Sequence, residues 1–183
     1  GDECDTAFFD KRSKFLHYLP EFVAINNIEF DHADIYNSLD EIKLTFRRLL
    51  NVVPQGGLAV VNGDDPNVLD VIDGAPCPVR TMGTGDHCEL RIEDVLYEPE
   101  GSSFTLGGER YTIPMVGEFN VRNAAMAVAG GMFAGLRAEE IRVAFASFEG
   151  IARRQQLHQR RGHARRGEGD LVLGVALRHH PHR

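Results

Sequence analysis

The sequence predicts an α/β fold, in which buried strands alternate with helices along the chain. A short apolar run at residues 22–25 has the length and composition of a buried strand, and residues 37–50 carry apolar side chains at helical spacing. A second apolar run at 58–61 follows that helix. Strand, loop, helix and strand in this order form the repeating unit of a parallel sheet. The apolar fraction of 43% supports a real core.

Local signals place the first elements. Ser38 stands where the 37–50 helix should begin, and Glu41 follows three residues later, which is the pattern of a capping box. After the strand at 58–61 the chain turns, and Pro66 suits the first turn of a short helix at 67–72.

The second half of the chain predicts more strands. We expect a third strand at 78–83 and a partly alternating one at 89–95. Residues 103–106 and 110–113 flank a Gly-Gly pair, which is typical of a hairpin. These strands are therefore expected as a small β-sheet appended to the α/β core.

Two helices should close this part of the chain. Residues 120–136 are rich in alanine and glycine, and such small side chains permit close approach to a sheet or to a ligand. Packing is the favoured interpretation for most of them. Residues 138–148 are amphipathic, with an expected inner face made of apolar side chains: Ile141, Ala144, Phe145 and Phe148.

Composition excludes several classes of protein. A net charge of −7 over 183 residues argues against a nucleic-acid binder, which needs a basic surface. Three cysteines without metal or redox spacing indicate reduced thiols in the cytoplasm. No apolar run approaches the length of a membrane span. We expect a cytoplasmic protein with neither nucleic acid nor a membrane as partner.

A polar cluster follows the first strand. Asp31, His32 and Asp34 lie just beyond residues 22–25, and ligands of open α/β sheets bind at the carboxyl ends of strands. Carboxylate and imidazole groups can bind Mg²⁺ or Mn²⁺. The alternative is an ordinary polar loop after a strand.

Five motifs, in order, resemble those of the Mur ligases, the ATP-dependent amide-bond-forming enzymes of peptidoglycan synthesis. The first is an acidic segment at 1–5, and the second is Asn27-Ile-Glu-Phe-Asp31-His32-Ala-Asp34. The others are Asn62-Gly-Asp-Asp65, Gly117-Glu-Phe-Asn120-Val-Arg-Asn123-Ala124 and Phe148-Glu-Gly-Ile-Ala-Arg153-Arg154-Gln-Gln156. Each motif is weak alone, but their order over most of the chain is specific. The resemblance implies part of a P-loop-type central ATPase domain and the start of a C-terminal α/β domain.

The segment from Asp5 to Tyr18 is similar to one branch of this family. That resemblance implies a ligase that joins UDP-N-acetylmuramate to L-Ala-γ-D-Glu-meso-diaminopimelate through an acyl phosphate, in peptidoglycan recycling. The alternatives are a ligase that adds L-alanine to UDP-N-acetylmuramate, and a catalytically inactive fragment whose basic tail binds anions or metals.

The resemblance also implies a metal site. His32 matches the family's metal-binding histidine, which implies a role for it in catalysis with Mg²⁺ as the metal. Asp31 and Asn27 would orient the His32 side chain without binding the metal themselves, as outer partners of metal ligands do. The alternative for His32 is a hydrogen-bonded loop histidine.

ATP is the second cofactor that the resemblance implies. Asn120 and Asn123 match the positions that hold the adenine, and carboxamides suit this task because they donate and accept hydrogen bonds. A helix N-cap is a further possible role for Asn120. Arg154 matches the arginine that reaches the ATP phosphates, and its implied role is catalytic.

The resemblance further implies how the chain is divided. Residues 1–148 are expected to form the latter part of the central ATP-binding domain, and 149–183 the beginning of the C-terminal ligase domain. No Gly-rich phosphate loop with its Lys-[Ser/Thr] is present, so we expect a fragment of a longer protein, inactive by itself.

The end of the sequence changes character at about residue 157. From there it contains six arginines, five of the eight histidines and no lysine. A basic tail that binds anions or metals is one interpretation. We favour a shifted reading frame, because the family pattern ends normally at Gln156 and only a His-His-Pro remnant of the next motif follows.

Overall fold

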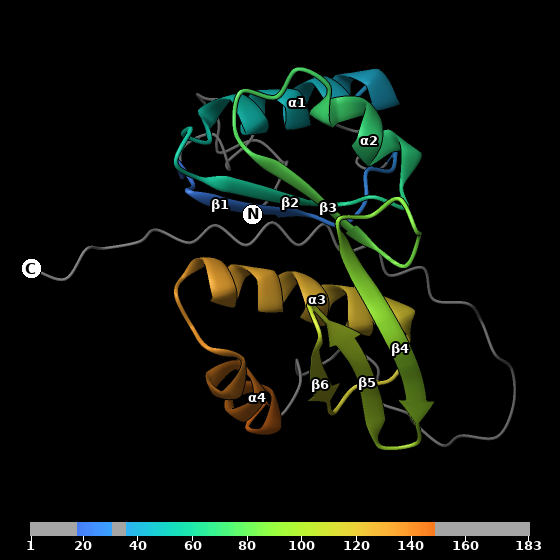
Figure 1. Ribbon diagram of the computed structural model, residues 1–183. Helices are drawn as coiled ribbons and strands as arrows, with labels where there is room; N and C mark the ends of the chain where they lie inside the picture. Colours follow the sequence, from blue (N-terminus) through green and yellow to red (C-terminus); the bar gives the residue numbers. More distant parts are fainter. Residues whose placement is uncertain (1–17, 31–35, 149–183) are drawn as a thin grey trace, which may run out of the picture.

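The computed structural model describes residues 18–30 and 36–148, which form one six-stranded sheet with helices on both of its faces (Figure 1). The strands lie side by side in chain order. They are β1 (Phe22–Ile25), β2 (Leu58–Asn62), β3 (Val79–Gly83), β4 (Leu90–Glu98), β5 (Gly101–Leu106) and β6 (Glu109–Ile113). The helices are α1 (Leu39–Val52), α2 (Pro66–Ile72), α3 (Glu118–Phe133) and α4 (Ala138–Ala146). The predicted α/β class is confirmed.

The strands change direction halfway across the sheet. β1 to β4 pair in parallel, whereas β4, β5 and β6 pair antiparallel. The junction is the short parallel contact between β3 and β4, with Met82 opposite Leu90 and Gly83 opposite Arg91. The strands that were expected as an appended sheet are present, and they continue the parallel sheet through this contact.

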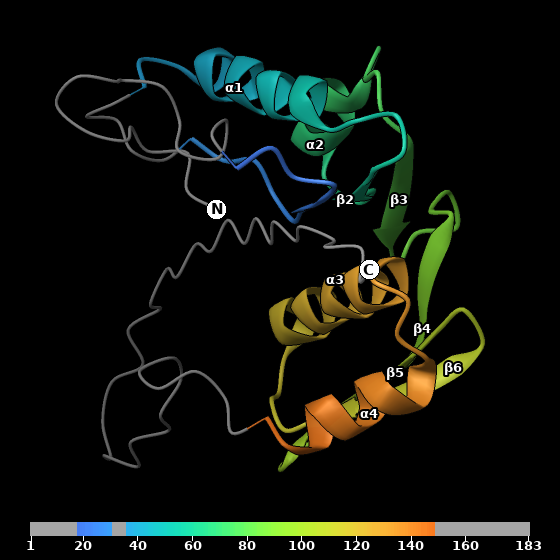
Figure 2. The same cartoon turned by 90° about the vertical axis from the view of Figure 1, so that its left-hand side faces the viewer.

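The sheet curls around α3. Figures 1 and 2 show α3 between the β1–β3 half of the sheet and the β4–β6 half, while α1 and α2 cover the other face of β1–β3. Strand side chains point alternately to opposite faces. Accordingly Phe22 and Ala24 pack with α3, and Val23 and Ile25 pack with α1 and α2. Because both faces of β1 are buried, its sequence is continuously apolar.

The start of α1 agrees with its predicted cap, with one change. The Ser38 hydroxyl accepts the Glu41 backbone N–H at 3.3 Å, as expected of an N-cap. The Glu41 carboxylate, however, accepts from the backbone N–H of Asn37 at 2.8 Å instead of from Ser38. The reciprocal half of the capping box is thus displaced by one residue toward the N-terminus.

The predicted hairpin is β5–β6. Gly107 and Gly108 both adopt positive φ angles, 61° and 81°, as the turn between two such strands requires. Ser102 lies opposite Ile113, and Leu106 lies opposite Glu109. This hairpin buries Phe104 against Tyr111 of the neighbouring strand, with ring centroids 5.7 Å apart.

Helix α3 begins and ends earlier than the predicted 120–136. Its N-cap is Gly117, with a φ of 114°, so Asn120 lies inside the first turn and the N-cap role considered for it is wrong. The packing interpretation of the small residues is confirmed at two positions. Gly130 approaches Phe22, and Gly131 approaches Ile141, so closely that an added Cβ would lie 3.1 Å from either side chain.

Helix α4 has a narrower inner face than predicted. Ile141 is buried and Phe145 is half-buried, whereas Ala144 and Phe148 are exposed. The rings of Phe145 and Tyr111 meet in an edge-to-face arrangement, with centroids 6.2 Å apart, so α4 contacts the sheet along one line at β6. None of the helices within residues 18–30 and 36–148 is long and apolar enough to cross a membrane.

Candidate functional site

The carboxyl ends of β1, β2 and β3 meet at one edge of the sheet, because these strands are parallel. Polar residues stand at these strand ends. Asn26 directly follows β1, and Asn62 is the last residue of β2. Asn62 is 3% exposed, and its Oδ1 accepts the backbone N–H of Asp64 at 3.0 Å. Buried amides at strand ends thus shape the turns that border this edge.

Asp65 joins the loop after β1 to the start of α2. Its Oδ1 accepts the backbone N–H groups of Asn67 and Val68, at 2.8 and 3.3 Å, which caps α2. Its Oδ2 accepts the backbone N–H of Ile28 at 3.2 Å. Asn67 completes the link by donating to the Ile28 carbonyl at 2.9 Å. The loop that leads toward residue 31 is therefore fixed by one carboxylate and one amide.

Asp64 holds the turn after β3. The backbone N–H groups of Thr84 and Gly85 donate to its two oxygens at 2.7 and 3.0 Å. Partial burial of Asp64 raises its pKa, but the hydrogen bonds from Thr84, Gly85 and Cys88 together outweigh that effect and leave the pKa below its ordinary value. A carboxylate charge is therefore maintained at this edge.

Two asparagines connect the strand edge to α3. Asn26 Nδ2 donates to Asn123 Oδ1 at 2.5 Å, across 97 residues of sequence. Asn26 is 5% exposed, and its Oδ1 is buried without a hydrogen-bond partner in the described structure. Buried polar atoms are rarely left unpaired. The pair therefore offers an acceptor that suits a ligand carrying an N–H donor.

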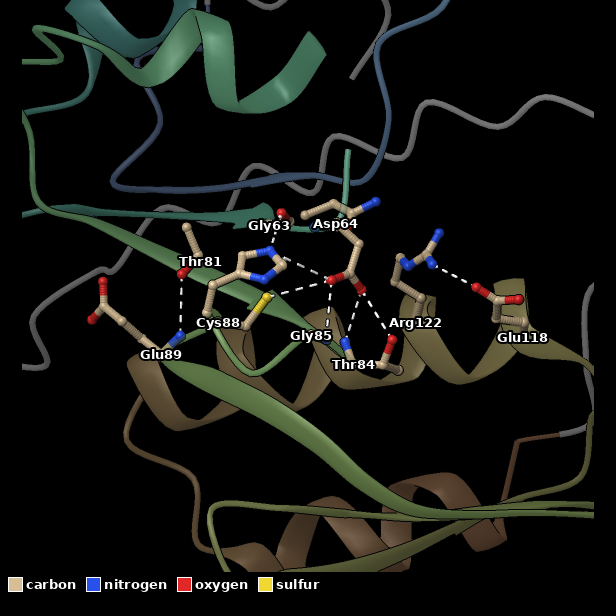
Figure 3. Close-up of polar contacts among 11 residues, drawn as sticks. Gly63, Asp64, Thr81, Thr84, Gly85, Cys88, Glu89, Glu118 and Arg122 are labelled. Carbon is tan, nitrogen blue, oxygen red and sulfur yellow. Dashed lines mark hydrogen bonds and ion pairs between the residues drawn. The ribbon is translucent and has the colours of Figure 1, made fainter. Parts of the chain in front are cut away.

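Asn120 lies one turn before Asn123 on the same side of α3, and its Nδ2 donates to the Val116 carbonyl at 2.9 Å. Next to it, Phe119 is 76% exposed at the start of α3. Arg122 is held by Glu118 at 2.7 Å (Figure 3). Exposed aromatic surface beside carboxamides is a combination suited to a flat, hydrogen-bonding ring.

The predicted site residues divide into two groups. Asn120 and Asn123 lie together on α3, and Asn27 is half-buried and donates to the exposed Glu29 carboxylate at 3.2 Å. The other predicted residues, with metal-binding, orienting or phosphate-binding roles, lie outside the described residues: Asp31, His32 and Arg154.

Sequence reasoning missed Asn26 and the role of Asp65. Asp65 had a visible signal, because an Asp directly before a proline at the first helical position is a typical N-cap. Asn26 had only the signal of a polar residue at the end of a buried strand. Its pairing with Asn123 depends on how α3 packs under the sheet.

The Mur ligase middle domain matches residues 7–131 of the chain. A UDP-N-acetylmuramate–L-alanyl-γ-D-glutamyl-meso-2,6-diaminoheptandioate ligase from Haemophilus influenzae is 33% identical over 86% of this chain and 35% of its own length. The Escherichia coli enzyme of the same name is 33% identical over 99% of this chain and 38% of its own length. A UDP-N-acetylmuramate–L-alanine ligase from Syntrophotalea carbinolica is 34% identical over 91% of this chain and 36% of its own length.

Solved structures agree with these sequence matches. The crystal structure of UDP-N-acetylmuramate:L-alanyl-γ-D-glutamyl-meso-diaminopimelate ligase from Neisseria meningitides superimposes with a TM-score of 0.72 at 34% identity, over 83% of this chain and 47% of that one. A murein peptide ligase from Psychrobacter arcticus gives 0.68 at 28% identity, over 83% of this chain and 32% of that one. The chain thus covers between 32% and 47% of the length of these relatives.

Proposed function

The chain belongs to the Mur ligase family, and from this premise we propose that it is part of an ATP-dependent carbon–nitrogen ligase. In this proposal residues 1–148 are the latter part of the central ATP-binding domain. Residues 149–183 are the beginning of the C-terminal ligase domain. The observation that carries the proposal is the family match over more than half of the chain, together with the curled sheet.

The substrates we propose are UDP-N-acetylmuramate and the peptide L-Ala-γ-D-Glu-meso-diaminopimelate, joined in peptidoglycan recycling. Two relatives that match most of the chain carry this activity in their names, and so does a solved structure at 34% identity. A ligase that adds L-alanine to UDP-N-acetylmuramate is the second candidate, because such a relative is 34% identical over 91% of the chain.

ATP would supply the phosphoryl group that activates the carboxylate of UDP-N-acetylmuramate as an acyl phosphate, which the amino group of the peptide then attacks. The described residues suit the adenine of this nucleotide. Asn120 and Asn123 lie one turn apart, and the buried Asn26 Oδ1 beside them lacks a donor. An adenine amino group is a donor of the required kind. Phe119 offers an exposed ring for stacking.

Mg²⁺ would neutralise charge on the phosphates. In the proposal His32 holds the metal, and Asp31 and Asn27 orient that ligand. Arg154 would contact the phosphates, for which a guanidinium has suitable geometry. Of these residues, only Asn27 lies within the described structure. It follows Asn26, which comes directly after β1.

The first test measures phosphate release by the complete protein that carries this segment, supplied with ATP, Mg²⁺ and UDP-N-acetylmuramate. We expect rapid release with the tripeptide and slow release with L-alanine or with no amine. The reverse preference would favour the L-alanine ligase. Equal release without any amine would contradict the ligase proposal itself.

A variant pair tests the proposed adenine contact. Asn120→Ala should raise the KM for ATP about two- to tenfold, since one lost hydrogen bond of this kind costs about 0.5–1.5 kcal/mol. Asn51→Ala is the matched control, because Asn51 is an exposed asparagine of α1 on the far face of the sheet. Equal KM values for the two variants would remove Asn120 from the nucleotide site.

The remaining alternative is a protein without ligase activity whose basic tail binds anions or metals. It predicts salt-sensitive binding to DNA, or retention on an immobilised-metal resin, that is lost when the chain is cut at Leu157. Retained binding after this cut would exclude that alternative.

A further inference from the structure

Three side chains with different metal-binding atoms meet where β2 and β3 end. They are Asp64, His87 and Cys88, and one ligand atom from each lies within 4.8 Å of the other two. Asp64 Oδ1 is 3.6 Å from Cys88 Sγ (Figure 3). The same oxygen is 3.8 Å from His87 Nε2. This group is separate from the asparagines of the proposed nucleotide site, and the proposed ligase reaction does not use it.

The backbone fixes this arrangement. Asp64 is held by the N–H groups of Thr84 and Gly85, and the Cys88 N–H donates to the Gly85 carbonyl at 3.0 Å. A Cβ at Gly83 or Gly85 would overlap the Asp64 carboxylate. Glycine at both positions therefore permits the carboxylate to approach the turn so closely.

The donor set indicates the class of metal. A carboxylate oxygen, an imidazole nitrogen and a thiolate sulfur are all ligands of Zn²⁺, with bond lengths of about 2.0–2.3 Å. In a tetrahedral site such bonds place neighbouring ligand atoms about 3.3–3.8 Å apart. The separation of 3.6 Å between the Asp64 and Cys88 atoms already falls in this range.

We propose that Asp64, His87 and Cys88 bind one Zn²⁺ ion or a similar divalent transition metal, with solvent as the fourth ligand. The Cys88 thiol gives its proton to solvent as the metal–sulfur bond forms. The Gly63 carbonyl is 2.7 Å from His87 Nε2 and can only accept, so Nε2 carries the N–H and Nδ1 is the ligand nitrogen. Nδ1 lies on the side of the carboxylate, because a Cβ at Gly85 would meet both His87 Nδ1, at 2.6 Å, and Asp64 Oδ1, at 2.8 Å. Metal enters from the side of His87, whose side chain is 59% exposed.

Such a metal would connect the turn after β2 to the turn after β3. Asp64 comes from the first turn, and His87 and Cys88 come from the second. The second turn leads into β4 and so into the antiparallel half of the sheet. The metal would thus stabilise the junction at which the sheet curls.

Cobalt spectroscopy on the full chain tests this site. Co²⁺ added to reduced, metal-free protein should give a thiolate-to-cobalt charge-transfer band, which Zn²⁺ then displaces. Cys88→Ser should lose the band, whereas Cys77→Ser and Cys4→Ser should keep it. The histidine-rich end of the chain, residues 157–183, contains no cysteine, so Co²⁺ bound there gives no thiolate band.

Two further substitutions separate ligands from neighbours. His87→Gln should weaken Co²⁺ binding at least about tenfold, the loss expected even for an outer partner of a metal ligand. Asp86→Asn is the matched control, because Asp86 adjoins His87 but pairs with Arg91 at 2.7 Å. Circular dichroism checks that each variant is folded.

A second measurement needs no variant. One equivalent of Zn²⁺ should slow alkylation of Cys88 at least tenfold and leave Cys77, which is similarly buried, unchanged. Mass spectrometry of the peptides gives both rates. Absence of the charge-transfer band from the wild-type chain, or no protection of Cys88 by Zn²⁺, would overturn the proposal.

Discussion

The hydrogen bond between Asn26 and Asn123 ties the end of β1 to α3 at the proposed nucleotide site. Its donor is buried, so loss of the acceptor leaves an N–H group without water or protein to satisfy it. Asn120 differs, because its bond to the Val116 carbonyl is exposed. These two asparagines, which share one motif, should therefore respond differently to the same substitution.

We predict that Asn123→Ala lowers the free energy of unfolding by about 1–3 kcal/mol. Asn120→Ala should change it by less than about 0.5 kcal/mol. Equilibrium urea unfolding, followed by circular dichroism, measures both. Equal stability of the two variants would mean that Asn26 finds another partner when Asn123 is absent.

At this scale the sequence predicts positions better than contacts. Asn120 and Asn123 were expected to act together, and they do lie on one side of α3. The sequence could not reveal Asn26 as their partner, because the contact spans 97 residues and depends on helix packing. The N-cap role of Asn120 was wrong, because Gly117 reaches a φ of 114° and starts the helix three residues earlier.

At the scale of elements, α1 depends on its N-cap. The Ser38 hydroxyl satisfies one of the free N–H groups of the first turn. We predict that Ser38→Ala lowers the free energy of unfolding by about 1 kcal/mol, whereas Ser38→Asp, which keeps an acceptor, does not. Urea unfolding curves of the two variants check this, and equal destabilisation by both would exclude the cap as the cause.

The β5–β6 hairpin depends on Gly101, which is needed for close packing and not for a positive φ angle. Gly101 opens β5, and a Cβ there would overlap the carbonyl oxygen of Ile113 on β6. Gly101→Ala should therefore cost about 1–3 kcal/mol, as overpacking does. Gly56→Ala is the control, since a Cβ at Gly56 meets nothing within 4 Å. Thermal unfolding should show a lower Tm for Gly101→Ala alone, and an unchanged Tm for both would mean that β6 moves aside without cost.

Most elements could be predicted because their signals are local. The apolar run of β1, the cap of α1 and the Gly107-Gly108 turn each identify an element without reference to the rest of the chain. Helix α4 was predicted less well. Its apolar spacing indicated a broad inner face over 138–148, but α4 meets the sheet at its last strand, so Ala144 stays exposed, and the helix ends at Ala146, before the exposed Phe148.

At the scale of the whole molecule, the curl of the sheet determines which surfaces are buried. Helix α3 fills the concave side and contacts both halves of the sheet. The sequence did not show this arrangement, because nothing near β4 indicates whether the later strands form a separate sheet. Two residue pairs, Met82 with Leu90 and Gly83 with Arg91, make the connection.

The two hydrophobic clusters that pack on opposite faces of β2 should therefore unfold together. Val60 belongs to the cluster around α3, and the adjacent Val61 belongs to the cluster under α1 and α2; both are fully buried. We predict that Val60→Ala and Val61→Ala each lower the free energy of unfolding by about 2 kcal/mol, from lost burial and the cavity left behind.

The two variants should also share one unfolding transition. Tyr111 reports on the first cluster and Tyr36 on the second, and the chain has no tryptophan to obscure them. Near-ultraviolet spectra of Tyr36→Phe and Tyr111→Phe proteins separate the two signals. Since one strand supplies side chains to both clusters, its loss exposes both at once, and coincident transitions are expected. If Val61→Ala instead melted the Tyr36 signal well before that of Tyr111, the two faces of the sheet would be separate folding units, and α3 with β4–β6 would form the more stable one.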